Sequence, residues 1–154
     1  MPATYAAEKL RSRHNIRMVD YDIDAALNVV DLGQPQGAGN KCLAIKDGYK
    51  NFLAALFRSV GTGTVTKFEI IAATAADGTG ATIVVSPAIA AAPDAVGDQI
   101  FLECDIEQVK EVLPTATHVG VRVQLATATD EAVVLFMRSE PTFATSGLTA
   151  DYVS

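Results

Sequence analysis

Residues 119–125 alternate strictly between aliphatic and small or polar side chains, and this pattern constrains the fold more than any other. The aliphatic positions are Val119, Val121, Val123 and Leu125. A period of two places alternate side chains on opposite faces of a strand, so one face is buried and the other is wet. Antiparallel sheets with one solvated face show this alternation. The sequence therefore predicts a β-protein.

Turn-forming residues separate several further segments of strand character. The expected strands are 25–32, 65–74, 82–85, 99–104, 119–125 and 132–138. Asp77-Gly78 predicts a hairpin between the second and third of these, because Asp and Gly tolerate positive φ. Asp130-Glu131 predicts a turn that leads from 119–125 directly back into 132–138. Tyr49 to Val60 stays open between helix and strand, with strand narrowly preferred, because its apolar residues fit both periods.

One short helix is expected within this succession of strands. Asp105 has the character of an N-cap, and Gln108 stands three residues later, where a capping box places its second residue. The helix should run from Ile106 to Leu113 and stop before Pro114.

The 154 residues have the usual length of one domain. About seven short strands at regular spacing predict an all-β, mainly antiparallel fold. We expect a β-sandwich or flattened barrel with one short helix and an extended N-terminal arm. The arm should occupy residues 1–24, the β-sandwich domain 25–141 and a C-terminal tail 142–154.

The charges are divided unevenly along the chain. Up to Arg58 there are eight Lys and Arg against six Asp and Glu, and from Ser59 onward four against twelve. The basic cluster of the arm could remain solvated, dock on an acidic protein surface such as the body of another copy, or touch nucleic acid. Nucleic acid is disfavoured because no aromatic residues interleave with the charges. The candidate partner-binding residues are Tyr5, Lys9, Leu10, Arg11, Arg13 and Arg17.

Only a weak candidate metal site is present. Asp20, Asp22 and Asp24 match the opening acids of a calcium loop, but Ala25 stands where that loop has glycine. Alternating acids also occur on the wet face of an edge strand. We therefore expect neither a metal nor another cofactor.

Catalytic residues are not evident. The two histidines, His14 and His118, have no recognisable nucleophile motif beside them, so no enzyme is expected. The glycine pairs Gly61/Gly63 and Gly78/Gly80 are expected to form turns.

Cys42 and Cys104 are expected to be buried thiols. The absence of a signal-peptide pattern and of a long apolar run predicts synthesis in a cytosol.

The overall composition resembles a known class of proteins. The body is rich in Ala, Thr, Val and Gly, with turns such as 76–80 and strands such as 119–125, and it lies between a charged arm and a polar tail. This resembles the small structural proteins of tailed-bacteriophage virions, particularly capsid decoration (cement) proteins. The resemblance implies a non-enzymatic protein, synthesised in the host cytoplasm, that forms homo-oligomers and binds and stabilises neighbouring capsid subunits in the virion through extended termini.

Two other functions remain open. One is a carbohydrate-binding β-sandwich, for which the aromatic candidates are Tyr49, Phe52, Phe143 and Tyr152. The other is a tail or head-completion component of a phage.

Overall fold

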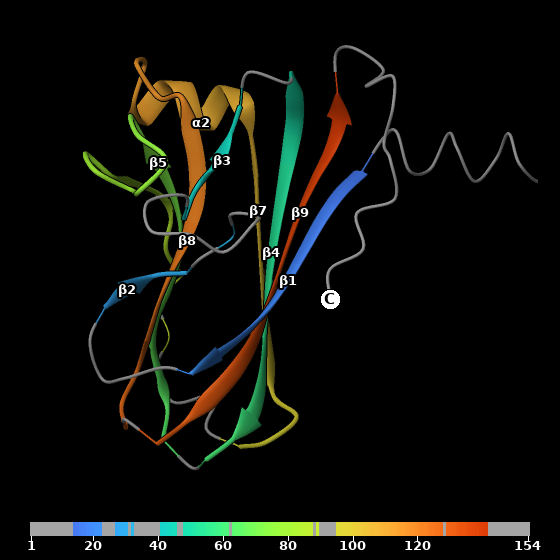
Figure 1. Cartoon of the computed structure of the whole chain (residues 1–154), viewed down its shortest axis with the longest axis vertical. Helices are drawn as coiled ribbons and strands as arrows, with labels where there is room; N and C mark the ends of the chain where they lie inside the picture. Colours follow the sequence, from blue (N-terminus) through green and yellow to red (C-terminus); the bar gives the residue numbers. More distant parts are fainter. Residues whose placement is uncertain are drawn as a thin grey trace, which may run out of the picture.

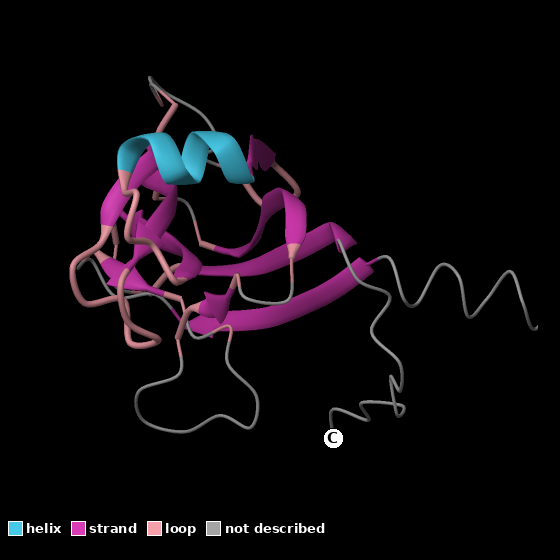
Figure 2. Cartoon of the chain, turned by 90° about the horizontal axis from the view of Figure 1, so that it is seen from above, coloured by secondary structure: helices cyan, strands magenta, loops and turns pink. Residues whose placement is uncertain are grey.

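The computed structural model describes residues 14–22, 27–30, 32, 41–45, 48–61, 63–87, 89, 95–127 and 129–141. These residues form two antiparallel sheets that face each other, with one helix across an end of the pair (Figures 1 and 2). This confirms the expected mainly antiparallel β-sandwich. The strands are β1 (His14–Asp22), β2 (Asn28–Val29), β3 (Leu43–Ala44), β4 (Tyr49–Val60), β5 (Val65–Ala73), β6 (Thr82–Val85), β7 (Gln99–Asp105), β8 (His118–Leu125) and β9 (Glu131–Pro141), and the helix is α2 (Ile106–Val112).

The strand order has a recognisable topology. The first sheet, sheet A, has the order β1-β9-β4-β7, and the second, sheet B, has the order β2-β8-β5-β6. The short strand β3 also pairs with β8, farther along it than β2 does, so β2 and β3 act as one interrupted strand. Counted in this way, consecutive strands alternate between the sheets except at the β5–β6 hairpin. This arrangement of eight strands in two sheets is that of a jelly roll.

The connection from β8 to β9 differs from our prediction of a hairpin. β8 pairs with β5 in sheet B, whereas β9 pairs with β1 and β4 in sheet A. Asp130-Glu131 therefore carries the chain across the sandwich. A turn signal in the sequence marks a change of direction, but it does not indicate whether the next strand returns beside the previous one or enters the other sheet.

The segment that fitted both helix and strand is β4, a central strand of sheet A. Phe52 and Leu56 are buried on its inner side, while Leu53 and Phe57 lie half-buried on its outer side. Inside the sandwich the rings of Phe52 and Phe136 stack with their centroids 6.3 Å apart. Large apolar side chains from both sheets fill this core, including Phe52, Phe68, Phe136, Leu56, Ile70 and Leu125.

Part of the expected arm belongs to the sandwich. β1 pairs with β9 along its whole length, from the His14–Ser139 pair to the Asp22–Glu131 pair. The polar sequence of β1 concealed this, because an edge strand is held largely by backbone hydrogen bonds and needs few large aliphatic side chains. The arm residues 1–13 and the tail residues 142–154 lie outside the described residues. Of the expected strand at 25–32, the described residues form only β2 and the adjacent positions.

The helix α2 begins as predicted. The Asp105 carboxylate accepts a hydrogen bond from the backbone N–H of Gln108 at 2.8 Å, and the Gln108 side-chain oxygen accepts one from the N–H of Asp105 at 3.0 Å. Val109 is fully buried, so the helix closes one end of the core. Within the described part of the chain, no helix is long and apolar enough to cross a membrane.

Candidate functional site

Most of the predicted partner-binding residues cannot be placed. Tyr5, Lys9, Leu10, Arg11 and Arg13 lie outside the described residues. Arg17 lies on β1, in register with Phe136 of β9. The arm as a contact site stays a prediction.

Two of the three acids of the candidate metal site lie on a strand. Asp20 and Asp22 belong to β1, in register with Val133 and Glu131, and Asp24 is outside the described residues. A calcium loop must curl around its ion. The extended backbone of Asp20 and Asp22 is that of an edge strand, which was the alternative interpretation. Among the residues that can be described, no group of three or more His, Cys, Asp or Glu could hold a metal ion.

The histidine of β8 lies beside a hydroxyl that is hydrogen-bonded to the backbone. The Thr117 hydroxyl donates to the carbonyl oxygen of Thr74 at 2.8 Å and lies 2.8 Å from Nδ1 of His118. While the hydroxyl proton is donated to Thr74, Nδ1 of His118 can only donate to Thr117, whereas a general base would have to accept the proton.

The cysteines and the glycine pairs have structural roles, as predicted. Cys42 and Cys104 are free and buried, and burial raises the pKa of each thiol to about 12. Gly61, Gly78 and Gly80 adopt positive φ in turns.

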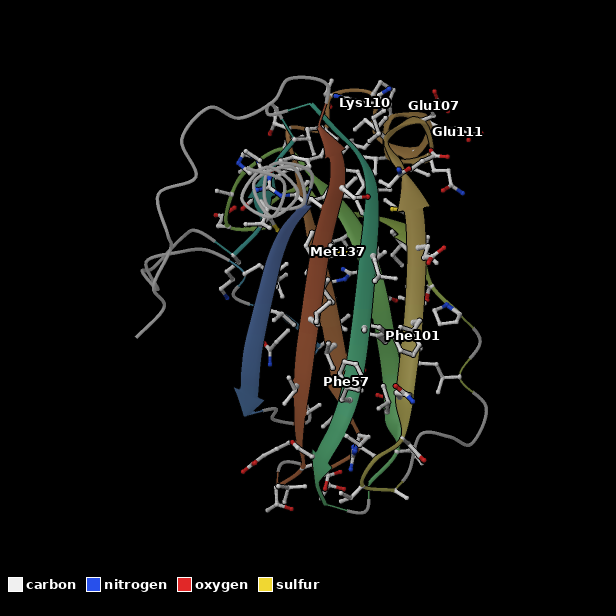
Figure 3. The ribbon with its side chains drawn as sticks, turned by 90° about the vertical axis from the view of Figure 1, so that its right-hand side faces the viewer. Phe57, Phe101, Glu107, Lys110, Glu111 and Met137 are labelled. Atoms are coloured by element: carbon white, nitrogen blue, oxygen red, sulfur yellow. The ribbon has the colours of Figure 1, made fainter. Side chains whose placement is uncertain are left out.

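The feature that sequence reasoning missed is an apolar surface on the solvent side of sheet A. In β4, β7 and β9, side chains that alternate with the core positions point outward, and those in the middle of the sheet are mostly apolar (Figure 3). We call this surface the outer apolar face, and it consists of Leu53, Ala55, Phe57, Phe101, Val133, Leu135 and Met137.

Strand register places these residues in three rows across the sheet. Leu53 pairs with Met137 in the first row, Ala55 lies between Phe101 and Leu135 in the second, and Phe57 pairs with Val133 in the third. Strands about 4.8 Å apart and rows about 6.8 Å apart give each position about 33 Å², so the seven apolar positions cover roughly 230 Å². Glu103 and Gln99 of β7 occupy the remaining positions of the first and third rows. The face is therefore contiguous.

Two aromatic rings stand at the β7 side of the outer apolar face. Phe101 is 55% exposed, and its ring meets that of Phe57 edge to face with centroids 5.9 Å apart. Figure 3 shows both rings on neighbouring strands, with Met137 farther along β9. The sequence signal for this face was the ambiguity of 49–60, since a strand that is apolar on both sides also fits a helical period.

A groove lies where the outer apolar face approaches α2. Its volume is about 470 Å³. Leu53 and Met137 supply apolar lining, and Glu103 and Asp105 supply carboxylates. We call it the outer groove, and its lining also includes Asn51, Gln108 and Ser139.

Acidic residues cluster beside the outer groove. Figure 3 shows Glu107 and Glu111 on α2 above the end of β7. We define the acidic corner as Glu103, Asp105, Glu107 and Glu111. The ion pairs found among the described residues are Arg58–Asp130 and Arg122–Glu69, and neither involves this corner.

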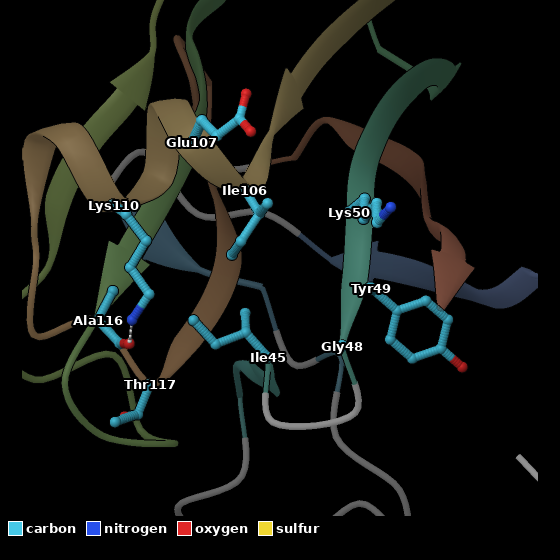
Figure 4. Close-up of a pocket in the computed structure, with 9 residues that line it drawn as sticks. All are labelled: Ile45, Gly48, Tyr49, Lys50, Ile106, Glu107, Lys110, Ala116 and Thr117. Carbon is cyan, nitrogen blue, oxygen red and sulfur yellow. Dashed lines mark hydrogen bonds between the residues drawn. The ribbon is translucent and has the colours of Figure 1, made fainter. Parts of the chain in front are cut away.

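A second pocket, the end pocket, lies beside α2 (Figure 4). Its volume is about 510 Å³, and Ile45, Tyr49, Lys50, Glu107 and Lys110 contribute to its lining. The Lys110 ammonium donates hydrogen bonds to the carbonyl of Ala116 at 2.6 Å and to that of Pro114 at 3.4 Å. Lys110 is thus directed toward backbone oxygens after the helix.

The aromatic candidates for sugar binding that lie among the described residues are buried. Tyr49 is 3% exposed and Phe52 1% exposed. The Arg138 guanidinium lies over the Tyr49 ring, 4.4 Å from its centroid. Phe143 and Tyr152 lie outside the described residues. The prediction was wrong for Tyr49 and Phe52, because both side chains are buried in the hydrophobic core.

Similarity to known proteins is weak. No protein-family model matches the chain, and no curated protein matches it. Among solved structures, the chain is similar to the coat protein of Tobacco streak virus, with 10% sequence identity and a TM-score of 0.36 over 91% of this chain and 94% of that one.

Proposed function

We propose that this chain is a non-enzymatic structural protein of a virion, of the capsid decoration (cement) type, which binds and stabilises neighbouring capsid subunits. The observation that carries the proposal is the outer apolar face of sheet A. The jelly-roll topology supports it, since this topology recurs in viral capsid domains, although lectin domains and cupins use it too.

The outer apolar face has the properties of an interface core. The largest contiguous apolar patch on a monomer is often functional, and the roughly 230 Å² of this face approaches the size of such a patch. A stable interface buries about 800 Å² on each partner, with an apolar centre and a polar rim. The outer apolar face would supply that centre. The remaining area has to come from the rim and from segments outside the described residues.

The filled interior of the sandwich favours a binding site on its outer surface. Phe52, Phe68 and Phe136 are fully buried between the sheets, so the space that a cupin-like fold could use for a ligand is filled with side chains. Multiple copies of a weak surface contact gain strength through multivalency, which suits a subunit that binds a repeated lattice.

The test is a charge placed in the centre of the face. Phe101→Asp should convert an oligomer into a monomer, measured as solution mass by light scattering across a concentration series. Ile83→Asp is the matched control, because Ile83 is 43% exposed and lies on β6 in sheet B. Circular dichroism should show both variants folded.

The outcomes separate the candidate functions. A wild-type chain that stays monomeric at all concentrations, or a Phe101→Asp variant with unchanged mass, would refute assembly through this face. Glycan-array binding that disappears in Phe101→Asp would instead favour the carbohydrate-binding alternative. A virion role further requires the chain to sediment with particles at a copy number comparable to that of the capsid subunit.

A further inference from the structure

We infer that the outer groove and the acidic corner form the docking site for the N-terminal segment, residues 1–13, of a neighbouring copy of the same chain. This inference rests on the proposed function and names the surface through which copies are joined.

The chemistry of the site is suited to a basic segment that carries apolar anchors. Leu53 and Met137 give the outer groove its apolar lining, and Glu103 and Asp105 line the same groove. Glu103, Glu107 and Glu111 are exposed. Lys50 and Lys110 line the end pocket together with Glu107, and Lys110 donates hydrogen bonds to backbone carbonyls there.

The N-terminal segment has the complementary composition. Residues 1–13 contain Lys9, Arg11 and Arg13 against a single acid, Glu8. Tyr5 and Leu10 provide apolar side chains that could contact Leu53 and Met137 in the outer groove. Charge complementarity across an interface fixes the register of the partners and speeds their encounter.

Chain geometry favours a neighbouring copy over the same molecule. His14 lies on β1, in the row of Ser139, Asn51 and Asp105, and β1 is three strands away from β7 in sheet A. Three strand spacings amount to about 14 Å. An extended chain advances about 3.3 Å per residue, so Arg13 lies about 3 Å and Arg11 about 10 Å of chain from His14. Within one molecule Arg13 falls short of the acidic corner, whereas Arg11, through the length of its side chain, Lys9 and earlier residues can reach it.

The segment of another copy has no such limit, because it can approach from outside the sheet. All three basic residues can then face the acidic corner while Leu10 or Tyr5 enters the outer groove. The same contact adds polar rim area beside the outer apolar face, which is too small alone for a stable interface.

The first experiment reverses charges on both sides of the contact in the full chain. Glu103→Lys/Glu111→Lys should weaken self-association roughly 10-fold, and added salt should weaken the wild-type contact. Thr66→Lys/Asp77→Lys/Thr79→Lys makes the same change of net charge on β5 of sheet B and the hairpin that follows it, and it should leave the mass unchanged. Lys9→Glu/Arg11→Glu should weaken association similarly, and mixing it with Glu103→Lys/Glu111→Lys should restore a mixed oligomer.

The second experiment separates neighbouring copies from the same copy. Isotopically light and heavy full-length chains are mixed and treated with a carbodiimide, which joins an amine and a carboxylate in contact. Cross-links from Lys9 to Glu103, Glu107 or Glu111 should combine light and heavy peptides.

Cross-linked peptides of one isotope only, or cross-links spread over carboxylates elsewhere, would overturn the inference. The inference and the proposed function can fail separately. If Phe101→Asp dissociates the oligomer while the corner variant and the mixing experiment show no effect, assembly through the outer apolar face stands and the docking site is wrong.

Discussion

A buried ion pair fastens the end of the sandwich opposite α2, and removing one of its members should strongly destabilise the fold. Arg58 and Asp130 are each 2% exposed, and Nη2 of Arg58 lies 3.4 Å from Oδ2 of Asp130. Asp130 stands where the chain crosses from sheet B to sheet A. Its carboxylate fills the space above Gly61 and Gly63, where a Cβ would collide with it.

The geometry predicts the size of the effect. The separation of 3.4 Å is longer than a charge-assisted hydrogen bond of about 2.8 Å. Among the described residues, Nε and Nη1 of Arg58 and Oδ2 of Asp130 have no hydrogen-bond partner. Each such buried polar atom costs about 1–3 kcal/mol. The two groups are therefore incompletely hydrogen-bonded, and the pair contributes little net stability. Even so, Asp130→Ala should lower the free energy of unfolding by about 3–5 kcal/mol, because it leaves a buried guanidinium without a counter-ion.

The double variant Arg58→Met/Asp130→Ala distinguishes this reasoning from simple loss of packing. It removes both charges and should lie within about 1 kcal/mol of the wild type or be more stable, whereas Arg58→Met alone also destabilises. For a chain of this length the single variant Asp130→Ala should melt roughly 6–20 °C lower than the wild type. Urea unfolding followed by far-ultraviolet circular dichroism gives the four free energies of the cycle. Additive effects of the two single changes would refute the reasoning.

Two further predictions concern the same fold. Gly61 and Gly97 have nearly equal φ values, +95° and +94°, but only a Cβ at Gly61 would collide with Asp130. Gly97→Ala should therefore cost only the roughly 1–2 kcal/mol of backbone strain, and Gly61→Ala should destabilise the fold by more than that. Equal losses of stability in thermal melts of the two variants would contradict this. Cys42 and Cys104, with pKa values of about 12 against an ordinary 9.0, should react with a disulfide reagent at pH 8 about 1000-fold more slowly than in urea, since the thiolate is the nucleophile. Rapid labelling of the native chain would contradict the burial of the two thiols. Because folding raises these pKa values, the stability contributed by the neutral thiols should be full below pH 9 and decline from pH 9 to 12.

Local chemistry made several elements predictable. The capping box at Asp105 and Gln108 and the alternation of 119–125 both depend on neighbouring residues, and both are found as expected. The crossing from β8 to β9 and the inclusion of 14–22 in sheet A depend on which strands become neighbours in space. Backbone hydrogen bonds supply that pairing, and they leave little trace in the side chains of an edge strand such as β1.

The candidate site was hidden for a related reason. The outer apolar face takes residues from β4, β7 and β9, which become adjacent only after the jelly roll forms. Tyr49 and Phe52 were candidates for exposed aromatic residues because aromatic type alone does not reveal which face of a strand a residue occupies. Phe101 is the exposed ring and Phe57 is half-buried beside it, and only the register of β4 against β7 brings them together.

The two sheets differ in how their outer sides are covered, and this difference favours a partner on sheet A. On sheet B, Ile71 and Ala73 point outward and are fully buried, because Cys42 and Val29 of the same chain pack over them. On sheet A, the outward residues of the central strands are also apolar, and apart from the small Ala55 they are only half-buried. Phe101 of the edge strand β7 is 55% exposed, and no other described segment packs over the face. Burying apolar side chains stabilises a protein by about 25 cal/mol for each Å² removed from water. Sheet A gains that stabilisation only when another molecule, or a segment outside the described residues, covers it.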